Sequence, residues 1–393
     1  MFKYLFKRDT ILATIMVFVV MSLLALIPIN THILNPIKMS LQDFDYNDLS
    51  YSRMGKNENT AVDTNIVIVN IGMGERKEIA EAIHTIETYN PKVIGVDVLF
   101  EEPKGAEQDS LLHGMAVISS NIVFAYNLHL NDKKFKPSGF LYNPAQQKGY
   151  VNFVGEHGGV IRHFAPAIMD DRKQYFSFAA SVVKIADENK FNHLLKRDHQ
   201  TEIIHYTRRP DKYVVIDAED VLSGAVTSTV FQNKIVLIGL VVNDEYAIED
   251  KHFTPMNKNA IGKSLPDMNG IFIHANIISM MLGNDYIQKI STWLVWLLAV
   301  LICWVHMSIF LRYFVEHHIW FHIVAKVAQI LSAVLFVYLG LILYHKLDFK
   351  LNMTPSLVAI ILGVDVLYFY EAICNWLHKK YNIVSVFNHH NHH

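Results

Sequence analysis

The chain alternates between long apolar runs and a large region in which short apolar runs are separated by polar turns. Four runs reach the length of about 20 mostly apolar residues that a helix needs to cross the hydrocarbon core of a membrane. They cover residues 11–29, 292–311, 322–344 and 354–376. We therefore predict four transmembrane helices, one near the N-terminus and three near the C-terminus.

Charged residues at the ends of these spans indicate how the chain crosses the membrane. Lys and Arg residues precede the first span, and Lys379 and Lys380 follow the fourth. Since cytoplasmic segments carry an excess of Lys and Arg, residues 1–10 and the His-rich tail, residues 377–393, are predicted to be cytoplasmic. No cleavage site of the Ala-x-Ala type follows the first span, so we expect this span to remain as an anchor.

Residues 30–290 lie between the first and second spans and are long enough to bury a core of their own. Short β-rich runs alternate there with amphipathic helical runs, which predicts an α/β domain with a mostly parallel open sheet flanked by helices. Buried strands are predicted at residues 65–72, 92–100, 121–128 and 233–241. Residues 129–150 are polar and contain Pro137 and Pro144, which indicates a long loop outside the sheet.

The composition fits a water-soluble domain attached to a few membrane helices. Of the 393 residues 51% are hydrophobic, and the net charge is −2, so nothing indicates binding to nucleic acid. Both cysteines, Cys303 and Cys374, lie in predicted spans. Disulfide bonds are therefore excluded from the outer domain.

Sequence motifs that would indicate an enzyme are missing. The outer domain has no cysteine, and the chain has no Gly-x-Ser-x-Gly and no His-Glu-x-x-His. Gly72-Met73-Gly74 follows a predicted strand, as a dinucleotide-binding motif would, but Lys77 occupies the position of the third glycine. We expect no catalytic activity, no cofactor and no metal site.

Polar side chains follow two of the predicted strands. Asp97 lies at the end of one strand, Asp244 follows another, and Asp250 and His252 come shortly afterwards. Because ligands of open α/β sheets bind at the carboxyl ends of the strands, these four residues are candidates for a shared ligand site. Alternatively, their side chains cap helices and fix loops by accepting hydrogen bonds from backbone amides.

Several blocks of the outer region follow one another in a characteristic order. They are KVIGVDVLFEEP, GGVIRHF, SFAASVV, DVLSGAV, NKIVLIG, DKHFTP and GIFIHANIISMML. In this order they resemble the CHASE-type extracellular sensor domains of the second subtype, over about residues 32–290. The resemblance implies a receptor with one span, a sensor domain and three further spans, which in the family lead into a cytoplasmic kinase or nucleotide cyclase.

The family pattern also marks single positions in this chain. It falls on Gly95, Asp97, Phe100, Gly159, Arg162, Lys234, Gly239, Asp250, Thr254, Pro255, His274, Ala275 and Asn276. It thus adds Arg162 to the candidate ligand-binding residues. His274 and Asn276 lie in a predicted helix that precedes the second span, and we interpret this helix as a coupling element. The chain departs from the family at NIGMGERKE, which replaces an acidic, Trp-containing turn, and at GGVIRHF, which lacks an Asp before its first Gly.

Charged and polar residues inside the predicted spans are costly in lipid and are therefore candidates for a functional role. His306, Lys326 and Glu371 are predicted to lie about 6–8 Å below the same membrane surface, with Lys326 and Glu371 as an ion pair. Asp365 lies in the middle of the fourth span, with Gln329 as its nearest partner by depth. These residues form either an interhelical clamp, a contact to another subunit, or a proton- or ion-linked site.

Only 17 residues follow Trp376, so an output domain of the family's kind is not expected in this chain. We expect a non-enzymatic receptor or scaffold in a bacterial inner membrane, with both termini cytoplasmic and the α/β domain periplasmic. It would bind a small molecule or protein outside and pass its state to a separate membrane protein or a second copy. The alternative is a structural or docking subunit of a larger envelope complex for secretion, transport or motor function.

Overall fold

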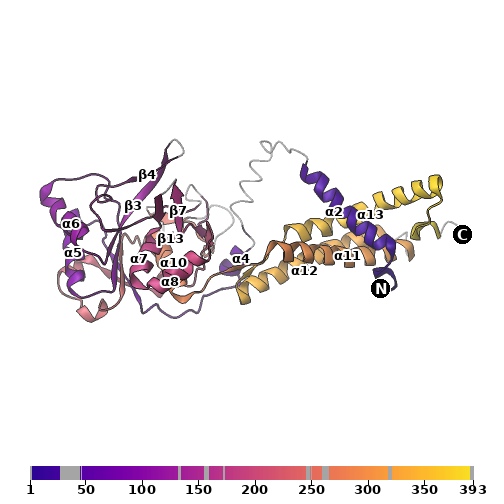
Figure 1. Cartoon of the computed structure of the whole chain (residues 1–393). Helices are drawn as coiled ribbons and strands as arrows, with labels where there is room; N and C mark the ends of the chain where they lie inside the picture. The colour runs from indigo at the N-terminus through magenta and orange to yellow at the C-terminus, as the bar shows by residue number, and fades with distance from the viewer. Residues whose placement is uncertain are drawn as a thin grey trace. The chain divides into compact units, whose positions relative to one another are not determined.

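The computed structural model describes the chain except for a set of short segments. These are residues 1, 27–44, 46, 132–133, 155–158, 171–172, 245–247, 249, 259–264, 317–320 and 390–393. The chain divides into two compact units, one of Met39–Ile287 and one of Met1–Lys38 with Gln288–His393. Figure 1 shows the sheet with its helices in the first unit and the long helices of the second.

A mostly parallel sheet forms the centre of the first unit. Its described strands are β1 (Ile66–Asn70), β2 (Val93–Asp97), β3 (Ile122–Asn131), β4 (Lys134–Ser138), β5 (Gln147–Tyr150), β10 (Val214–Asp217) and β11 (Ile235–Gly239). They run in the order β10-β1-β11-β2-β3-β4, with β5 also beside β3, and only the β3–β4 pair is antiparallel. The central strands are continuous apolar runs because helices cover both faces.

Successive side chains of a strand point to opposite faces of the sheet, so their contacts show which helices cover each face. Ile94 and Val96 pack with α5 (Arg76–Thr88), α6 (Ala106–Ile118) and α9 (Ala218–Leu222) in one apolar core. Gly95 lies between these two residues and faces the opposite way, toward Phe178 of α7 (Phe178–Ala186). The second face is covered by α7 and α10 (Gly270–Gly283), and α8 (Glu188–Lys196) packs against both. The predicted fold class is therefore confirmed.

Short elements complete the first unit. They are α4 (Asp48–Ser52), the hairpins β7 (Ala167–Asp170) with β8 (Lys173–Phe176) and β12 (Lys251–His252) with β13 (Met268–Asn269), the pair β6 (His163–Phe164) with β9 (Glu202–Ile203), and the 3-10 turns Pro210–Lys212 and Ser228–Val230.

The four predicted buried strands are confirmed, but the prediction of a loop at residues 129–150 is wrong. In its place β3 continues to Asn131, β4 returns antiparallel to it, and β5 adds a parallel strand. Pro137 lies in β4, opposite Leu128, at the edge of the sheet. Proline is tolerated on an edge strand, where its missing N–H breaks no ladder, so its presence did not exclude a strand.

Four long apolar helices make up most of the second unit and confirm the predicted number of candidate spans. They are α2 (Arg8–Leu26), α11 (Thr292–Glu316), α12 (Phe321–Leu347) and α13 (Thr354–Tyr381), accompanied by α1 (Phe2–Leu5), the pair β14 (Gln288–Lys289) with β15 (Phe349–Lys350) and the 3-10 turn Val386–His389. Apolar residues of α2, α11, α12 and α13 share one core. Residues 27–29 of the first predicted span and residues 390–393 of the tail lie outside the described residues.

Close packing of α7 against β5 makes Gly149 a sensitive position. A Cβ there would lie 2.7 Å from the backbone nitrogen of Phe178 and 2.9 Å from the carbonyl carbon of Ser177. We therefore expect Gly149→Ala to lower the free energy of unfolding by about 1–3 kcal/mol, because backbone atoms of α7 must move. Thermal unfolding of the purified full chain, followed by circular dichroism, measures this change.

Gly114→Ala is the matched control. Gly114 lies inside α6, no atom lies within 4 Å of the place that a Cβ would take, and alanine is the better helix former by about 1 kcal/mol. Melting temperatures that are equal for the two variants would contradict this account of the α7 packing.

Candidate functional site

The site is formed where β2 and β11 end side by side. Asp97 is the last residue of β2 and pairs in register with Gly239, the last residue of β11. A Cβ at Gly239 would lie 3.4 Å from the Asp97 Cβ and 2.8 Å from the Ile271 Cδ1. The missing side chain of Gly239 therefore lets the first turn of α10 lie directly beside Asp97.

The amino end of α10 brings further polar groups to this place. The Gly270 amide donates a hydrogen bond to the backbone oxygen of Asp250. The Cβ position of Gly270 lies 3.5 Å from Asp250 Oδ1, 3.6 Å from His252 Nε2 and 3.7 Å from Phe153 Cε2. Asp250 has a φ of 54°, a left-handed conformation that Asp tolerates better than most residues.

Two histidine rings share the aromatic ring of Phe153. His274, one turn into α10, stacks on Phe153 with 4.7 Å between ring centroids, and His252 meets the same ring at 5.2 Å. His274 is buried, and its Nδ1 has no hydrogen-bond partner among the described residues. Burial, with a smaller contribution from His252, lowers the pKa of His274 to about 3, so its ring is neutral at physiological pH. We refer to Asp97, Phe153, Asp250, His252 and His274 as the strand-edge cluster.

The charge of Asp250 opposes the ionisation of Asp97 in the strand-edge cluster. Burial, and then the neighbouring charge of Asp250, raise the pKa of Asp97 to about 8. Asp97 is half-buried and forms no hydrogen bond or ion pair within the described part of the chain, whereas Asp250 is exposed. At neutral pH Asp97 is therefore protonated for the most part. Asp250 is the exposed member of the cluster, whereas Phe153 and His274 are buried.

Comparison with protein families identifies the domain. A family model of the CHASE2 domain matches residues 21–311. The chain belongs to the CHASE2 domain family. Comparison with curated proteins and with solved structures finds no match. The resemblance expected from the sequence is thus confirmed, and the chain combines a sensory domain with four helices that are long and apolar enough to cross a membrane.

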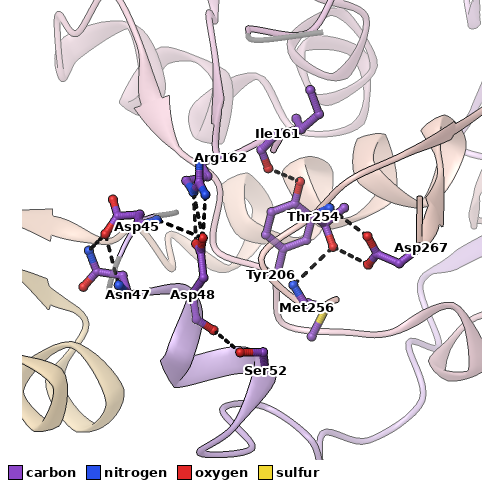
Figure 2. A network of polar contacts seen from close by, with 10 residues as sticks. All are labelled: Asp45, Asn47, Asp48, Ser52, Ile161, Arg162, Tyr206, Thr254, Met256 and Asp267. Carbon is purple, nitrogen blue, oxygen red and sulfur yellow. Dashed lines mark hydrogen bonds and ion pairs between the residues drawn. The ribbon is translucent and has the colours of Figure 1, made fainter. Parts of the chain in front are cut away.

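Three predicted site residues of the CHASE2 domain meet in the strand-edge cluster, and two lie elsewhere. Asp97, Asp250 and His252 come together as predicted from the strand ends. Arg162 instead pairs with Asp48 of α4, with 3.0 Å between Arg162 Nε and Asp48 Oδ1 (Figure 2). Asp244 is exposed on the loop after β11, where the Lys251 ammonium donates a hydrogen bond to its backbone oxygen.

The Arg162–Asp48 pair holds α4 against the rest of the first unit. Both side chains are largely buried, and burial raises the pKa of Asp48 although the Arg162 guanidinium opposes this shift. Near it, Asp267 accepts hydrogen bonds from the Thr254 amide and hydroxyl (2.8 and 2.6 Å), while burial raises the pKa of Asp267 to about 6 (Figure 2). These residues therefore stabilise loops, which is the alternative that the sequence left open for polar side chains.

Asn276 of the predicted coupling helix is fully buried and satisfies backbone groups of a neighbouring segment. Its Oδ1 accepts hydrogen bonds from the Thr207 and Arg208 amides, both at 3.0 Å. Its Nδ2 donates to the backbone oxygens of Arg208 and Phe272. Asn276 thus fixes α10 to residues 207–208, and any displacement of α10 must carry that segment along or break these bonds.

The predicted pairing of polar residues in the spans is wrong. Lys326 forms an ion pair with Asp365, at 3.1 Å, and not with Glu371. Gln329 donates to the backbone oxygens of Ile360 and Ile361 and not to Asp365. The predicted depths assumed a span that ends at residue 376, but α13 continues to Tyr381.

Within the described part of the chain, His306 makes no hydrogen bond or ion pair with the polar group of Lys326, Gln329 and Asp365. Its ring Nδ1 lies 2.9 Å from the backbone oxygen of Ile302, one turn earlier in α11, and its ring meets Phe310 at 5.6 Å. The polar contacts described between α12 and α13 therefore include those of Lys326 with Asp365 and of Gln329 with the α13 backbone, which are compatible with the predicted interhelical clamp.

The raised pKa of Asp97 predicts how stability varies with pH. In the unfolded chain an Asp ionises near pH 4, whereas in the folded domain Asp97 keeps its proton up to about pH 8. The folded state thus binds the extra proton between these values, and the contribution of Asp97 to stability falls as the pH rises from about 4 to about 8. We expect Asp97→Asn to flatten this fall, measured as the melting temperature of the full chain at pH 5, 7 and 8.5.

Asp217→Asn serves as the control for this pH series, because Asp217 also ends a parallel strand, β10, but is exposed. It should keep the pH profile of the wild type. A profile of Asp97→Asn that is indistinguishable from the wild type would show that Asp97 ionises normally in the folded domain.

The Lys326–Asp365 pair gives a second prediction, for the membrane helices. Lys326→Met leaves the Asp365 charge without its partner and is expected to destabilise the helices by up to about 3 kcal/mol. The double variant Lys326→Met with Asp365→Leu removes both charges and should recover most of this loss. Thermal unfolding in lipid nanodiscs compares the two; a double variant that is less stable than the single one would refute an interaction between these charges.

Proposed function

We propose that this chain is a non-enzymatic membrane receptor whose CHASE2 domain binds a ligand at the strand-edge cluster and passes its state through α10 to the membrane helices. The observation that carries this proposal is the position of α10. The helix begins within the cluster at Gly270 and ends at Gly283, and only residues 284–291 separate it from α11.

The burial of α10 supports its role as a rigid connector. Its residues from Gly270 to Ile278 are all buried, and it packs against α7, α8 and β11. The Asn276 hydrogen bonds add a fixed attachment on a further side. A helix held on several sides shifts as a unit, because packed interfaces change between discrete arrangements and do not deform smoothly.

The chemistry of the strand-edge cluster favours binding over catalysis. His274 is neutral, Asp97 is protonated near neutral pH, and the Phe153 ring contacts both histidine rings. No serine, threonine or cysteine belongs to the cluster as the described contacts define it. The groups present offer hydrogen bonds and a carboxyl group that changes charge on binding, which are the requirements of recognition.

The orientation and the partner are part of the proposal. Lys379 and Lys380 at the end of α13 support a cytoplasmic C-terminus, and therefore a CHASE2 domain outside the cytoplasm, in the periplasm of a bacterial inner-membrane protein. A receptor of this kind acts on a separate membrane protein or on a second copy of itself.

The distribution of tryptophan allows a direct test of transmission. All five tryptophans lie in the unit that contains the membrane helices, and the unit that contains the sheet has none. A change in the charge of Asp97 is therefore made in one unit, and the tryptophan fluorescence that reports it comes from the other. In nanodiscs, the intrinsic tryptophan emission of the full chain should show a transition near pH 8 that is lost in Asp97→Asn and kept in Asp217→Asn.

The result separates the receptor from the alternative. An emission profile that is unaffected by Asp97→Asn means that the strand-edge cluster does not communicate with the membrane helices. The CHASE2 domain would then act as a docking module of a larger envelope complex, the second function considered from the sequence.

A further inference from the structure

A second group of polar side chains lies at another part of the sheet, beside β3 and β5. It comprises Tyr126 on β3, Lys148 and Tyr150 on β5, Lys173 and Tyr175 on β8, and Tyr142 on the segment between β4 and β5. We refer to these six residues as the tyrosine–lysine cluster. None of them belongs to the strand-edge cluster, and the proposed receptor function does not use them.

Strand register explains why these residues gather. Tyr126 and Tyr150 are opposite each other in the parallel pair of β3 and β5. Lys148 precedes Tyr150 by two residues and therefore faces the same side of the sheet. The β7–β8 hairpin brings Tyr175 into the same apolar group, and Tyr142 packs against it with its ring centroid 4.9 Å from that of Tyr126.

Both lysine side chains reach the ring of Tyr142. Lys148 Nζ lies 4.5 Å from the ring centroid and donates a hydrogen bond to the Tyr142 backbone oxygen. Lys173 Nζ lies 5.3 Å from the same centroid, 2.8 Å from the Tyr142 hydroxyl and 4.9 Å from the Tyr175 centroid. Two ammonium groups are thus held around one aromatic ring.

Neither lysine of the tyrosine–lysine cluster has an ion-pair partner within the described part of the chain. The nearest carboxylate along the hairpin is that of Asp170, which is opposite Lys173 in the β7–β8 register but accepts a hydrogen bond from the Phe135 amide. Burial, and then the charge of Lys173, lower the pKa of Lys148, whereas the hydrogen bond to the Tyr142 hydroxyl raises the pKa of the exposed Lys173. A half-buried ammonium beside a second one is electrostatically unfavourable and gains from any anion that binds between them.

Hydrogen-bond donors are also in excess. Tyr126 is only 3% exposed, and its phenol makes no hydrogen bond within the described residues. The Tyr150 phenol is used, since it donates to the Ala165 backbone oxygen. An oxyanion offers acceptors only and carries negative charge, so it complements both a phenol that has no acceptor and an ammonium group.

We propose that the tyrosine–lysine cluster is a binding site for a small tetrahedral oxyanion of the phosphate class, held by the ammonium groups of Lys148 and Lys173 and by the phenol of Tyr126. The anion would be either free phosphate or the phosphate group of a monoester.

Inorganic phosphate is the probe for a first test on the full chain in nanodiscs. Phosphate should raise the melting temperature in a saturable manner beyond that of chloride at equal ionic strength. Lys148→Met should weaken the apparent affinity about tenfold or more, the loss expected for one charged hydrogen bond. Tyr126→Phe removes only the phenol oxygen, keeps the packed ring and should also weaken binding, which covers the case that Lys148→Met folds poorly.

Lys184→Met is the matched control. Lys184 also lies over two aromatic rings, those of Phe176 and Phe191 at 5.7 and 5.8 Å, but outside the tyrosine–lysine cluster, so its variant should bind phosphate as the wild type does. Glycerol 3-phosphate identifies the source: equal affinities indicate the free anion, and tighter binding of the ester indicates a phosphate monoester. Stabilisation by phosphate no larger than that by chloride, or unchanged affinity in both Lys148→Met and Tyr126→Phe, would overturn the proposal.

Discussion

The close approach of α7 and α10 to one face of the sheet is the constraint on which the rest of the CHASE2 domain depends. It requires positions without side chains: Gly95 and Gly149 under Phe178 of α7, and Gly239 under Ile271 of α10. Protein interiors have no spare volume for even one methyl group at such contacts. Because Gly239 is also the last residue of β11, the same contact that closes the core places the amino end of α10 beside Asp97. Packing and the candidate site therefore have one structural origin.

The electrostatics of the strand-edge cluster follow from this packing. The packing places Asp97 beside α10. Among the described residues, no cation and no amide stabilises the charge of its carboxylate, and Asp250 lies close enough to oppose its ionisation further. A carboxyl group kept protonated in this way costs stability as the pH rises from about 4 to about 8, so the fold gains nothing from it at neutral pH. The buried pair of Arg162 with Asp48 shows the contrast, since there a charge removed from water is matched and serves to attach α4. An unmatched ionisable group at the carboxyl ends of parallel strands is the better indication of a binding role.

The sequence predicted those features that depend on neighbours along the chain. Apolar runs located the buried strands and the four long helices. The strand-end rule selected Asp97, Asp250 and His252, which lie in the cluster, and Asp244, which does not. Prediction from the sequence failed where the deciding contact joins residues far apart along the chain. Asp48 lies 114 residues from its partner Arg162, and the role of Phe153 depends on two histidines from separate elements. The β3–β4 hairpin was missed because Pro137 and the polar residues around it are compatible with both a loop and an edge strand. The tyrosine–lysine cluster was missed for the first reason, as its residues are spread over β3, β5 and β8 and no spacing relates them.

The two clusters of the CHASE2 domain carry ionisable groups of opposite sign and therefore favour ligands of opposite charge. The strand-edge cluster has acidic groups that favour the approach of a positive charge, and it lies at the start of α10, which continues through a short segment into α11. The tyrosine–lysine cluster has two ammonium groups without an ion-pair partner among the described residues, and it lies on β3, β5 and the β7–β8 hairpin, none of which leads directly into a membrane helix. In the proposed receptor, a ligand at the first cluster would bias the position of α10, whereas an anion at the second would stabilise the strands around β3 and β5. The anion would therefore set how firmly these strands are held, and the ligand at Asp97 would act on α10.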